Sequence, residues 1–428
     1  MLELLNLRDR RERLEPRGLE IDLSTADAVR GIIERVRAEG DEALFDFTLK
    51  FDGADLRHTG LTVSPQEFQR AEETVPSELK AALDALVDRL TDLHRRQLPM
   101  EWWDERDGVR FGEIVRPLPR AGCYVPGGRA KYPSSVAMTV VPAVVAGVER
   151  VVVCTPPSPD GSIHPAVLYA AARAGASAVA KVGGAQAVAA LAFGTASIQA
   201  VDRIVGPGNV YVTEAKRQVA GFVGIDGLAG PTELAIVADA SADPAWVAAD
   251  LVAQAEHDPE ALAVLVAFDG EVVDQVKQAL EAEVTRAGRS DVVRAALAHA
   301  RTVLVADDDQ AVEELDRLAP EHLHVVVAEA PAFAQRIRNA GAIFVGGFTP
   351  VAFGDYGVAS NHVLPTAGTA RFSSGLRAAD FVKVSSVVEV SDGAAAALAP
   401  EVARIALAEG LPGHARAVEI RVEGRRPT

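Results

Sequence analysis

The chain has 428 residues, a formal net charge of −17 at pH 7, 49% hydrophobic residues and only 5% aromatic residues. A chain of this length exceeds what one hydrophobic core sustains, so several packed units are expected. The negative charge disfavours nucleic acid and anionic membrane surfaces as partners, because both repel an acidic protein.

The N-terminal segment and the cysteines indicate a cytoplasmic protein. The first residues include charged side chains at once, without the apolar core of a secretory signal. The most apolar window, 134–154, is interrupted by proline, glycine and charged residues, whereas a membrane helix needs roughly 20 apolar residues. Cys123 and Cys154 are too few for a disulfide framework.

The first hundred residues have helical patterns. Ser64 and Glu67 fit a capping box with Pro65 at the first helical position, and residues 77–98 keep helical spacing. From about residue 120, short β-branched runs alternate with Ala-rich helical stretches. Strands are expected at 150–154, 178–182 and 201–205, and helices at 134–147, 164–174 and 185–193. This alternation predicts βαβ units around a parallel sheet.

The alternation begins again after the Gly-rich stretch 224–231. The expected strands lie near 234–238, 262–267, 302–305, 323–327 and 342–345. A long irregular stretch at 347–376 follows, which is uncommon in a compact domain unless it has a function. A helical tail is expected at 391–417. We therefore predict an α/β fold with two similar parallel-sheet units.

Three Gly/Pro turns at strand ends indicate a ligand-binding edge. They cover 122–128, 182–186 and 206–209, and no G-x-G-x-x-G motif accompanies them. In open parallel sheets, ligands bind beyond the carboxyl ends of the strands, where glycines let a ligand approach backbone N–H groups. Any one of them alone could be a plain tight turn. Together they favour a nucleotide or a phosphate-bearing ligand.

Two pairs of polar residues are candidate metal or catalytic groups. Gln254 and His257 project from one face late in a predicted helix, a spacing that suits two ligands of one metal or a solvated polar stripe. Glu321 and His322 stand where a helix gives way to a strand. His322 and His324 should share one side of that strand, with Glu321 on the other unless a bend redirects it. Capping with one buried histidine is the alternative.

Two further segments carry histidine beside a carboxylate. The irregular stretch contains Asp355 and His362 in a loop rich in glycine and asparagine, which favours a site. In the tail, Glu409 and His414 flank the turn 410–413, which alone would be a surface turn. Four segments thus combine histidine with Asp, Glu or Gln. This donor set suits zinc better than a thiolate site does.

The motifs of the chain resemble the histidinol dehydrogenase family across nearly its whole length. In the family's order, they are GCYVPGG, VGGAQAVAALAFGT, VGPGNVYVTEAKRQV, GPTELAIVAD, QAEHDP, PEHL, FGDYGVASNHVLPTAGTARFSSGL and EGLPGHARAVEIR. The resemblance implies two incomplete Rossmann-like α/β domains with helical N- and C-terminal extensions. It also implies a homodimer in which the tail of one subunit completes the active site of the other.

The resemblance also implies domain boundaries. Residues 1–22 would be an N-terminal extension, and 23–123 with 232–376 the first α/β domain, which holds the metal and catalytic residues. Residues 124–231 would be the second α/β domain, on the NAD side. Residues 377–428 would be the C-terminal extension that completes the partner's site.

Site residues follow from the matched motifs. One zinc ion per subunit would be bound by Gln254, His257, Asp355 and His414. The catalytic pair would be Glu321 and His322. The substrate would contact the four zinc ligands and His322. It would also contact Thr232, His362 and Glu409. NAD would contact Tyr124, Gln186 and Asn209. Thr232 departs from the family's usual serine but keeps the hydroxyl.

The activity implied by the resemblance is oxidation of L-histidinol through L-histidinal to L-histidine with two NAD molecules. Zinc would anchor the substrate's imidazole and amine, His322 would take the hydroxyl proton, and Glu321 would activate water in the second step. A thiohemiacetal on Cys123 or Cys154 is an alternative mechanism. Alternative functions are oxidation of another amino or sulfonated alcohol, zinc-dependent hydrolysis, and metal binding without catalysis.

Overall fold

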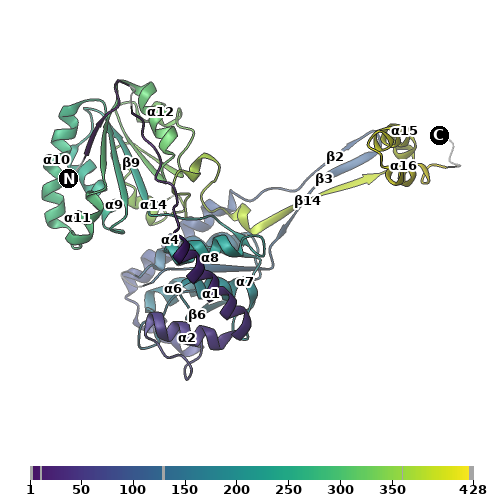
Figure 1. The fold of residues 1–428 in the computed structure, drawn as a ribbon, viewed down its shortest axis with the longest axis horizontal. Helices are drawn as coiled ribbons and strands as arrows, with labels where there is room; N and C mark the ends of the chain where they lie inside the picture. The colour runs from purple at the N-terminus through teal and green to yellow at the C-terminus, as the bar shows by residue number, and fades with distance from the viewer. Residues whose placement is uncertain (1–2, 10–11, 128–130, 359, 424–428) are drawn as a thin grey trace. The chain divides into compact units, whose positions relative to one another are not determined.

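The computed structural model describes residues 3–9, 12–127, 131–358 and 360–423, which form two compact units (Figure 1). The first unit consists of residues Met1–Gln97 and Leu118–Phe381, and the second of Leu98–Pro117 and Val382–Thr428. No helix in the described ranges is long and apolar enough to cross a membrane. Each unit is considered by itself below.

The first unit contains a six-stranded parallel sheet with helices on both faces. Its strands, in the order β1-β11-β10-β9-β12-β13, are Glu3–Asn6, Arg301–Leu304, Leu262–Ala267, Glu233–Ala238, His322–Val326 and Ala342–Val345. One face packs on α9 (Pro244–Ala255), α10 (Gly270–Arg286) and α11 (Ser290–Leu297), and the other on α12 (Asp308–Leu318) and α13 (Ala330–Ala334). The nearly continuous apolar strands β9 and β10 fit a sheet buried on both sides.

The first unit also contains a five-stranded parallel sheet. Its strands, in the order β6-β5-β4-β7-β8, are Ala178–Ala180, Arg150–Cys154, Arg120–Tyr124, Arg203–Val205 and Gly224–Ile225. The helices that connect these strands are α5 (Pro133–Val145), α6 (Pro165–Ala174), α7 (Gly184–Phe193) and α8 (Val210–Val219). Both sheets confirm the predicted α/β class, and the strand positions agree with those expected to within a few residues.

The N-terminal helices belong with the second sheet rather than the first. They are α1 (Leu23–Glu39), α2 (Asp41–Asp52), α3 (Pro65–Thr74) and α4 (Ser77–Arg95). Apolar residues of α1 and α2 join the core formed by α7, α8 and the second sheet, and α3 and α4 contact α6 and α5. The expected domain boundaries placed residues 23–123 with residues 232–376. The structure differs, because the buried faces of these helices pack against the five-stranded sheet and its helices. The capping box at Ser64 and Glu67 is confirmed.

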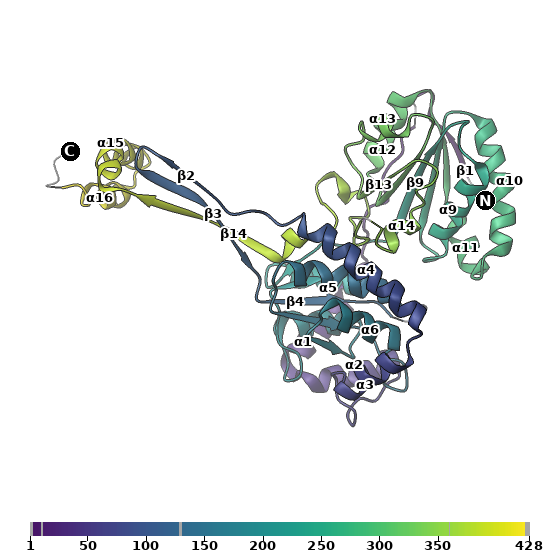
Figure 2. The ribbon, with the colours of Figure 1, turned by 180° about the vertical axis from the view of Figure 1, so that it is seen from behind.

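The second unit is a three-stranded antiparallel sheet followed by two helices. Strands β2 (Trp102–Arg106), β3 (Val109–Pro117) and β14 (Val382–Val390) pair in the order β14-β3-β2. The expected helical tail is two helices, α15 (Asp392–Ala408) and α16 (Pro412–Glu419), which bury small alanine side chains against each other. The sequence patterns did not predict this sheet. Figure 2 shows the strands and helices from behind.

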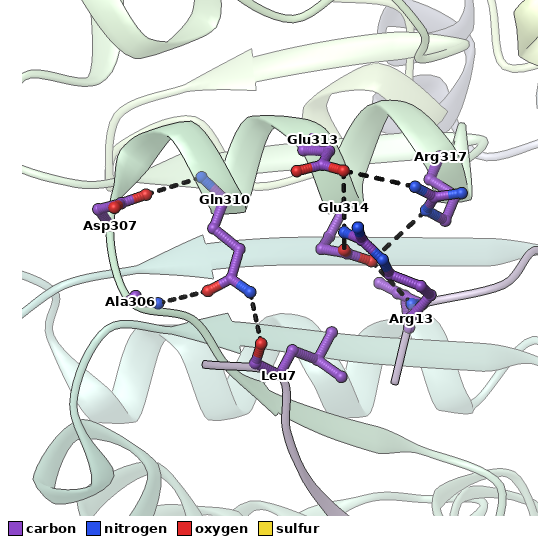
Figure 3. Close-up of polar contacts among 9 residues, drawn as sticks. Leu7, Arg13, Ala306, Asp307, Gln310, Glu313, Glu314 and Arg317 are labelled. Atoms are coloured by element: carbon purple, nitrogen blue, oxygen red, sulfur yellow. Dashed lines mark hydrogen bonds and ion pairs between the residues drawn. The ribbon is translucent and has the colours of Figure 1, made fainter. Parts of the chain in front are cut away.

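The segment that leads from β1 to α1 is anchored to α12 by buried polar contacts (Figure 3). The Gln310 side chain donates to the carbonyl oxygen of Leu7 and accepts from the amide of Ala306. The carboxylate of Glu314, which is fully buried, accepts from Arg13 at 2.7 Å and from the amide of Leu14 at 2.8 Å. These contacts give hydrogen-bond partners to the Leu7 carbonyl and to the amides of Leu14 and Ala306.

Replacing Gln310 with leucine should destabilise the first unit, because the buried carbonyl of Leu7 and the partly buried amide of Ala306 would each lose a hydrogen-bond partner. We expect the free energy of unfolding to fall by about 1–3 kcal/mol. The matched control is Gln275→Leu on the exposed side of α10, which should change it by less than about 0.5 kcal/mol. Thermal unfolding of both variants provides the comparison, and equal midpoints would contradict the anchoring role.

Candidate active site

The candidate site lies at the amino ends of β9 and β12, which are neighbours in the six-stranded sheet. Thr232 precedes β9 and Glu321 precedes β12, and the register pairs His322 with Leu234. The strand order reverses here, because β10 follows β9 on one side and β12 lies on its other side. Parallel pairing therefore brings residues almost 90 positions apart in the chain to one edge.

Glu321 is a buried carboxylate held by the edge of β9. Its Oε2 accepts hydrogen bonds from Thr232 Oγ1 at 2.6 Å and from the Glu233 amide at 2.8 Å. Burial raises the pKa of the Glu321 carboxyl above its usual value, although these hydrogen bonds and His322 oppose the shift. A carboxylate with a raised pKa is a stronger base than an exposed one. The bend before β12 also keeps Glu321 beside His322, with Oε2 3.6 Å from Nδ1.

His322 has one ring nitrogen bonded and the other free. Its Nδ1 lies 3.1 Å from the backbone carbonyl oxygen of Glu233. A carbonyl only accepts hydrogen bonds, so Nδ1 carries the proton, and in the neutral ring Nε2 is basic. Nε2 is buried without a hydrogen-bond partner among the described residues and lies 4.0 Å from Asp355 Oδ1. Such an orphaned buried nitrogen points to a missing ligand.

Three of the residues expected to bind metal meet next to this pair. Gln254 is buried near the end of α9, and its Nε2 donates to Thr232 Oγ1 at 3.1 Å, which leaves its amide oxygen available. His257 Nε2 lies 3.8 Å from Asp355 Oδ2. The neighbouring carboxylate of Asp355 raises the pKa of His257. Burial by itself would raise the pKa of the Asp355 carboxyl, but the nearby histidines, His257 first, lower it.

Asp355 ends the short helix α14 (Ala352–Asp355), which packs closely on the sheet. A Cβ at Gly354 would lie only 2.4 Å from the Phe344 ring, so glycine is required for this approach. Among the described residues, no group of three or more His, Cys, Asp and Glu side chains is placed to hold a metal ion. The candidate set within the first unit includes only two such side chains, His257 and Asp355, together with the Gln254 amide.

His362 connects the irregular stretch to α5. Its Nε2 lies 3.1 Å from Ser135 Oγ, and its Nδ1 lies 3.0 Å from the backbone oxygen of Asp355. Burial lowers the pKa of His362 and favours the neutral ring. The neighbouring Asn361 donates to the Met138 carbonyl at 2.7 Å, which fixes the loop on the same helix. Ser135 was not among the residues expected at the site; its one sequence signal is a hydroxyl in the first turn of a helix.

The three residues expected to meet NAD lie at the carboxyl edge of the five-stranded sheet. Tyr124 ends β4, and its hydroxyl accepts from the Gly184 amide at 3.1 Å; burial raises the pKa of Tyr124 to about 12. Gln186 is buried in the first turn of α7. Asn209 caps α8 by accepting from the amides of Tyr211 and Val212. The strand order reverses between β4 and β7, which is where ligands bind open α/β sheets.

Glu409 and His414 belong to the second unit. Glu409 follows the last turn of α15, and His414 lies in α16; both are exposed in this chain. The four expected zinc ligands are thus divided between the two compact units.

The two cysteines are inaccessible. Cys123 and Cys154, on the adjacent strands β4 and β5, are fully buried and unpaired. Burial raises the pKa of the Cys123 thiol to about 12 and raises that of Cys154 further. Neither thiol therefore has the exposed, ionised character that nucleophilic catalysis needs. The structure argues against a thiohemiacetal mechanism.

Two parallel sheets flanked by helices, with a buried carboxylate–imidazole pair at the amino ends of two neighbouring strands, are typical of an α/β enzyme. The family model of histidinol dehydrogenase matches residues 17–422. Histidinol dehydrogenase from a Synechococcus species is 48% identical over 396 residues, with 92% of this chain and 91% of that one covered. The enzyme from Methanosarcina mazei is 44% identical over 420 residues, with coverages of 97% and 96%.

A solved structure agrees with this family assignment. The crystal structure of histidinol dehydrogenase from Elizabethkingia anophelis has a TM-score of 0.94 and 33% sequence identity, and the match covers 99% of this chain and 98% of that one. The chain belongs to the histidinol dehydrogenase family, and it is an oxidoreductase.

Native protein should resist thiol labelling, because both cysteines are buried and un-ionised near neutral pH. We expect an aromatic disulfide reagent to modify almost no thiol in the folded chain at pH 8 and two thiols after denaturation in guanidinium. Absorbance of the released thiolate gives the count. Rapid labelling of one thiol in native protein would restore the covalent mechanism as an alternative.

Proposed function

We propose that the chain oxidises L-histidinol through L-histidinal to L-histidine with two molecules of NAD, the last steps of histidine biosynthesis. The proposal is carried by the His322 ring, whose buried Nε2 has no hydrogen-bond partner among the described residues and whose Nδ1 lies 3.6 Å from the carboxylate of Glu321. A general base must lie within hydrogen-bond reach of the proton that it removes, and an unpaired ring nitrogen can accept the proton of an alcohol. Membership of the family supports the choice of substrate.

The residues fit a zinc ion. Gln254, His257 and Asp355 offer an amide oxygen, an imidazole nitrogen and a carboxylate oxygen, all of which zinc accepts. We propose that His414 is the fourth ligand. When bound, zinc would hold the imidazole and amine of histidinol, and NAD would accept one hydride in each oxidation.

His322 acts as the base in the first oxidation. Its Nδ1 proton is held by the Glu233 carbonyl at 3.1 Å, so Nε2 is directed to receive the hydroxyl proton of the substrate as the alcohol carbon loses hydride. His362, Thr232 and Glu409 are proposed to orient the substrate. The hydroxyl of Thr232 already bridges Glu321 and Gln254.

Glu321 acts in the second oxidation. We propose that its carboxylate takes a proton from water as the water oxygen attacks the aldehyde carbon of histidinal. The resulting hydrate then gives hydride to the second NAD, and its hydroxyl protons pass to His322 and to solvent, which leaves the carboxylate product. Burial, which raises the pKa of Glu321, makes it a better base for this step. No covalent intermediate with a thiol is required.

We further propose that two copies of the chain form a homodimer with shared active sites. Glu409 and His414 belong to the second compact unit, whereas the other proposed ligands belong to the first. In this proposal, the second unit of one copy supplies both residues to the site of the other copy. Tyr124, Gln186 and Asn209 would contact NAD at the carboxyl edge of the five-stranded sheet.

Two other functions remain distinguishable by experiment. A zinc hydrolase would use the same donors but would not bind NAD, and a relative specific for another amino or sulfonated alcohol would not act on histidinol. The deciding assay follows NADH formation from NAD and L-histidinol before and after treatment with a chelator. Absence of NADH formation from zinc-loaded protein would overturn the proposed function.

Replacing His257 or Asp355 with alanine should abolish bound zinc and activity together, because each variant loses one of four ligands. The control is His299→Ala, which removes an exposed imidazole near Glu260 and should retain full zinc. Metal analysis of the purified variants gives the ratio of zinc to chain. Full zinc content in either ligand variant would contradict its assignment.

Substitutions of the two proposed catalytic residues should affect the rates of the two oxidation steps differently. Glu321→Gln should impair oxidation of histidinal more than that of histidinol, because only the aldehyde step needs an activated water. His322→Asn should slow both. General-base assistance typically contributes about a hundredfold to ten-thousandfold, so the difference is measurable.

Single-turnover formation of NADH from each substrate tests these roles, because product release cannot then hide the chemical step. Equal slowing of both substrates by Glu321→Gln would mean that Glu321 orients the site instead of activating water.

A further inference from the structure

A buried ion pair holds the first residue of the turn after β7. Lys216 of α8 and Asp226, which follows β8, have side chains only 3% and 9% exposed, and Nζ lies 2.6 Å from Oδ1. Lys216 Nζ also donates to the carbonyl oxygen of Gly206 at 2.5 Å. Asp226 Oδ2 accepts from the amide of Gly206 at 2.7 Å. Both polar groups of one backbone residue are therefore fixed by one ion pair.

Gly206 directly follows β7, which pairs with β4 at the point where the strand order of the five-stranded sheet reverses. It has φ +115°, and a Cβ there would lie 2.0 Å from the carbonyl oxygen of Tyr124, so only glycine fits against the end of β4. The turn that it begins ends at Asn209, the cap of α8. The ion pair thus acts on a turn that packs against the backbone of Tyr124 and ends at Asn209, which are two of the three residues proposed to meet NAD.

Stability alone is a poor explanation for this pair. Burying two charges costs desolvation, and well-packed apolar side chains of similar volume often stabilise a fold as well or better. Apolar side chains could not fix the amide and carbonyl of Gly206. The two charged side chains fix the orientation of the amide and the carbonyl of Gly206.

We propose that Lys216 and Asp226 are positioning residues that orient the turn 206–209 for NAD before the cofactor arrives. The inference rests on the proposed NAD-dependent function. A turn that is already ordered loses less conformational entropy on binding, so the same contacts give a higher affinity. Without the pair, the Gly206 peptide can rotate, and the cost of ordering the turn is added to cofactor binding.

Lys216→Met and Asp226→Asn test the proposal. Each should raise the dissociation constant of NAD by about tenfold, while zinc content and the KM for histidinol at saturating NAD stay near those of the wild type. Calorimetric titration with NAD gives the affinity. The rise in unfolding midpoint caused by NAD, taken relative to each variant's own midpoint, separates weaker binding from lower stability. If Lys216→Met does not fold, Asp226→Asn, which keeps the side-chain shape, decides.

The matched control is Glu214→Gln on the same helix. Glu214 is a fully buried carboxylate paired with Arg217 at 2.6 Å, and none of its contacts involves Gly206. The Glu214→Gln variant should bind NAD with the affinity of the wild type. If the control and the two variants weaken NAD binding equally, or none does, the positioning role is overturned. A wild type that fails to bind NAD would instead overturn the proposed function itself.

Discussion

The hydrogen bonds between the Glu321 carboxylate and the start of β9 are the contacts on which the candidate site depends. Two donors, the Thr232 hydroxyl and the Glu233 amide, converge on one oxygen of a buried carboxylate. The carbonyl oxygen of Glu233 meanwhile orients the His322 ring. A single strand end therefore sets the direction of both members of the pair. A shift in the pairing of β9 with β12 would disrupt both, because the register controls every contact across this edge.

The positions of the site residues also depend on the irregular stretch that follows β13. It lacks long regular elements, yet Asn361 and His362 contact α5 through Met138 and Ser135. These contacts link the layer of the six-stranded sheet to that of the five-stranded sheet within the first unit. The loop is ordered by hydrogen bonds to other elements, which explains how a long connection can carry functional residues at defined positions.

The sequence predicted the regular parts of the fold well, because buried parallel strands and amphipathic helices have strong local patterns. It predicted β5, β10 and β13 at the observed bounds. Strands β2, β3 and β14 were not predicted, because exposed antiparallel strands have little apolar periodicity and depend on partners distant in the chain. The packing of α1 to α4 was likewise out of reach, since an apolar helix face does not specify which sheet covers it.

For the candidate site, the motifs selected residues that the first unit does place together, namely Gln254, His257, Glu321, His322, Asp355 and His362. The roles of Glu233 and Ser135 were missed. Glu233 acts through its backbone, which leaves no local signal, and Ser135 acts through a contact across 227 positions. A hydroxyl near the start of a helix is too common to reveal such a contact. Assignments to zinc, substrate and NAD stay proposals.

The burial of the two cysteines also bears on how the enzyme withstands oxidants. Peroxide reacts with thiolates, and burial raises the pKa of both thiols, which keeps them protonated near neutral pH. Neither sulfur reaches the surface of the described chain. Sulfenic acid formation at these positions must therefore await local opening of strands β4 and β5, so the stability of the five-stranded sheet sets the rate of oxidative damage there.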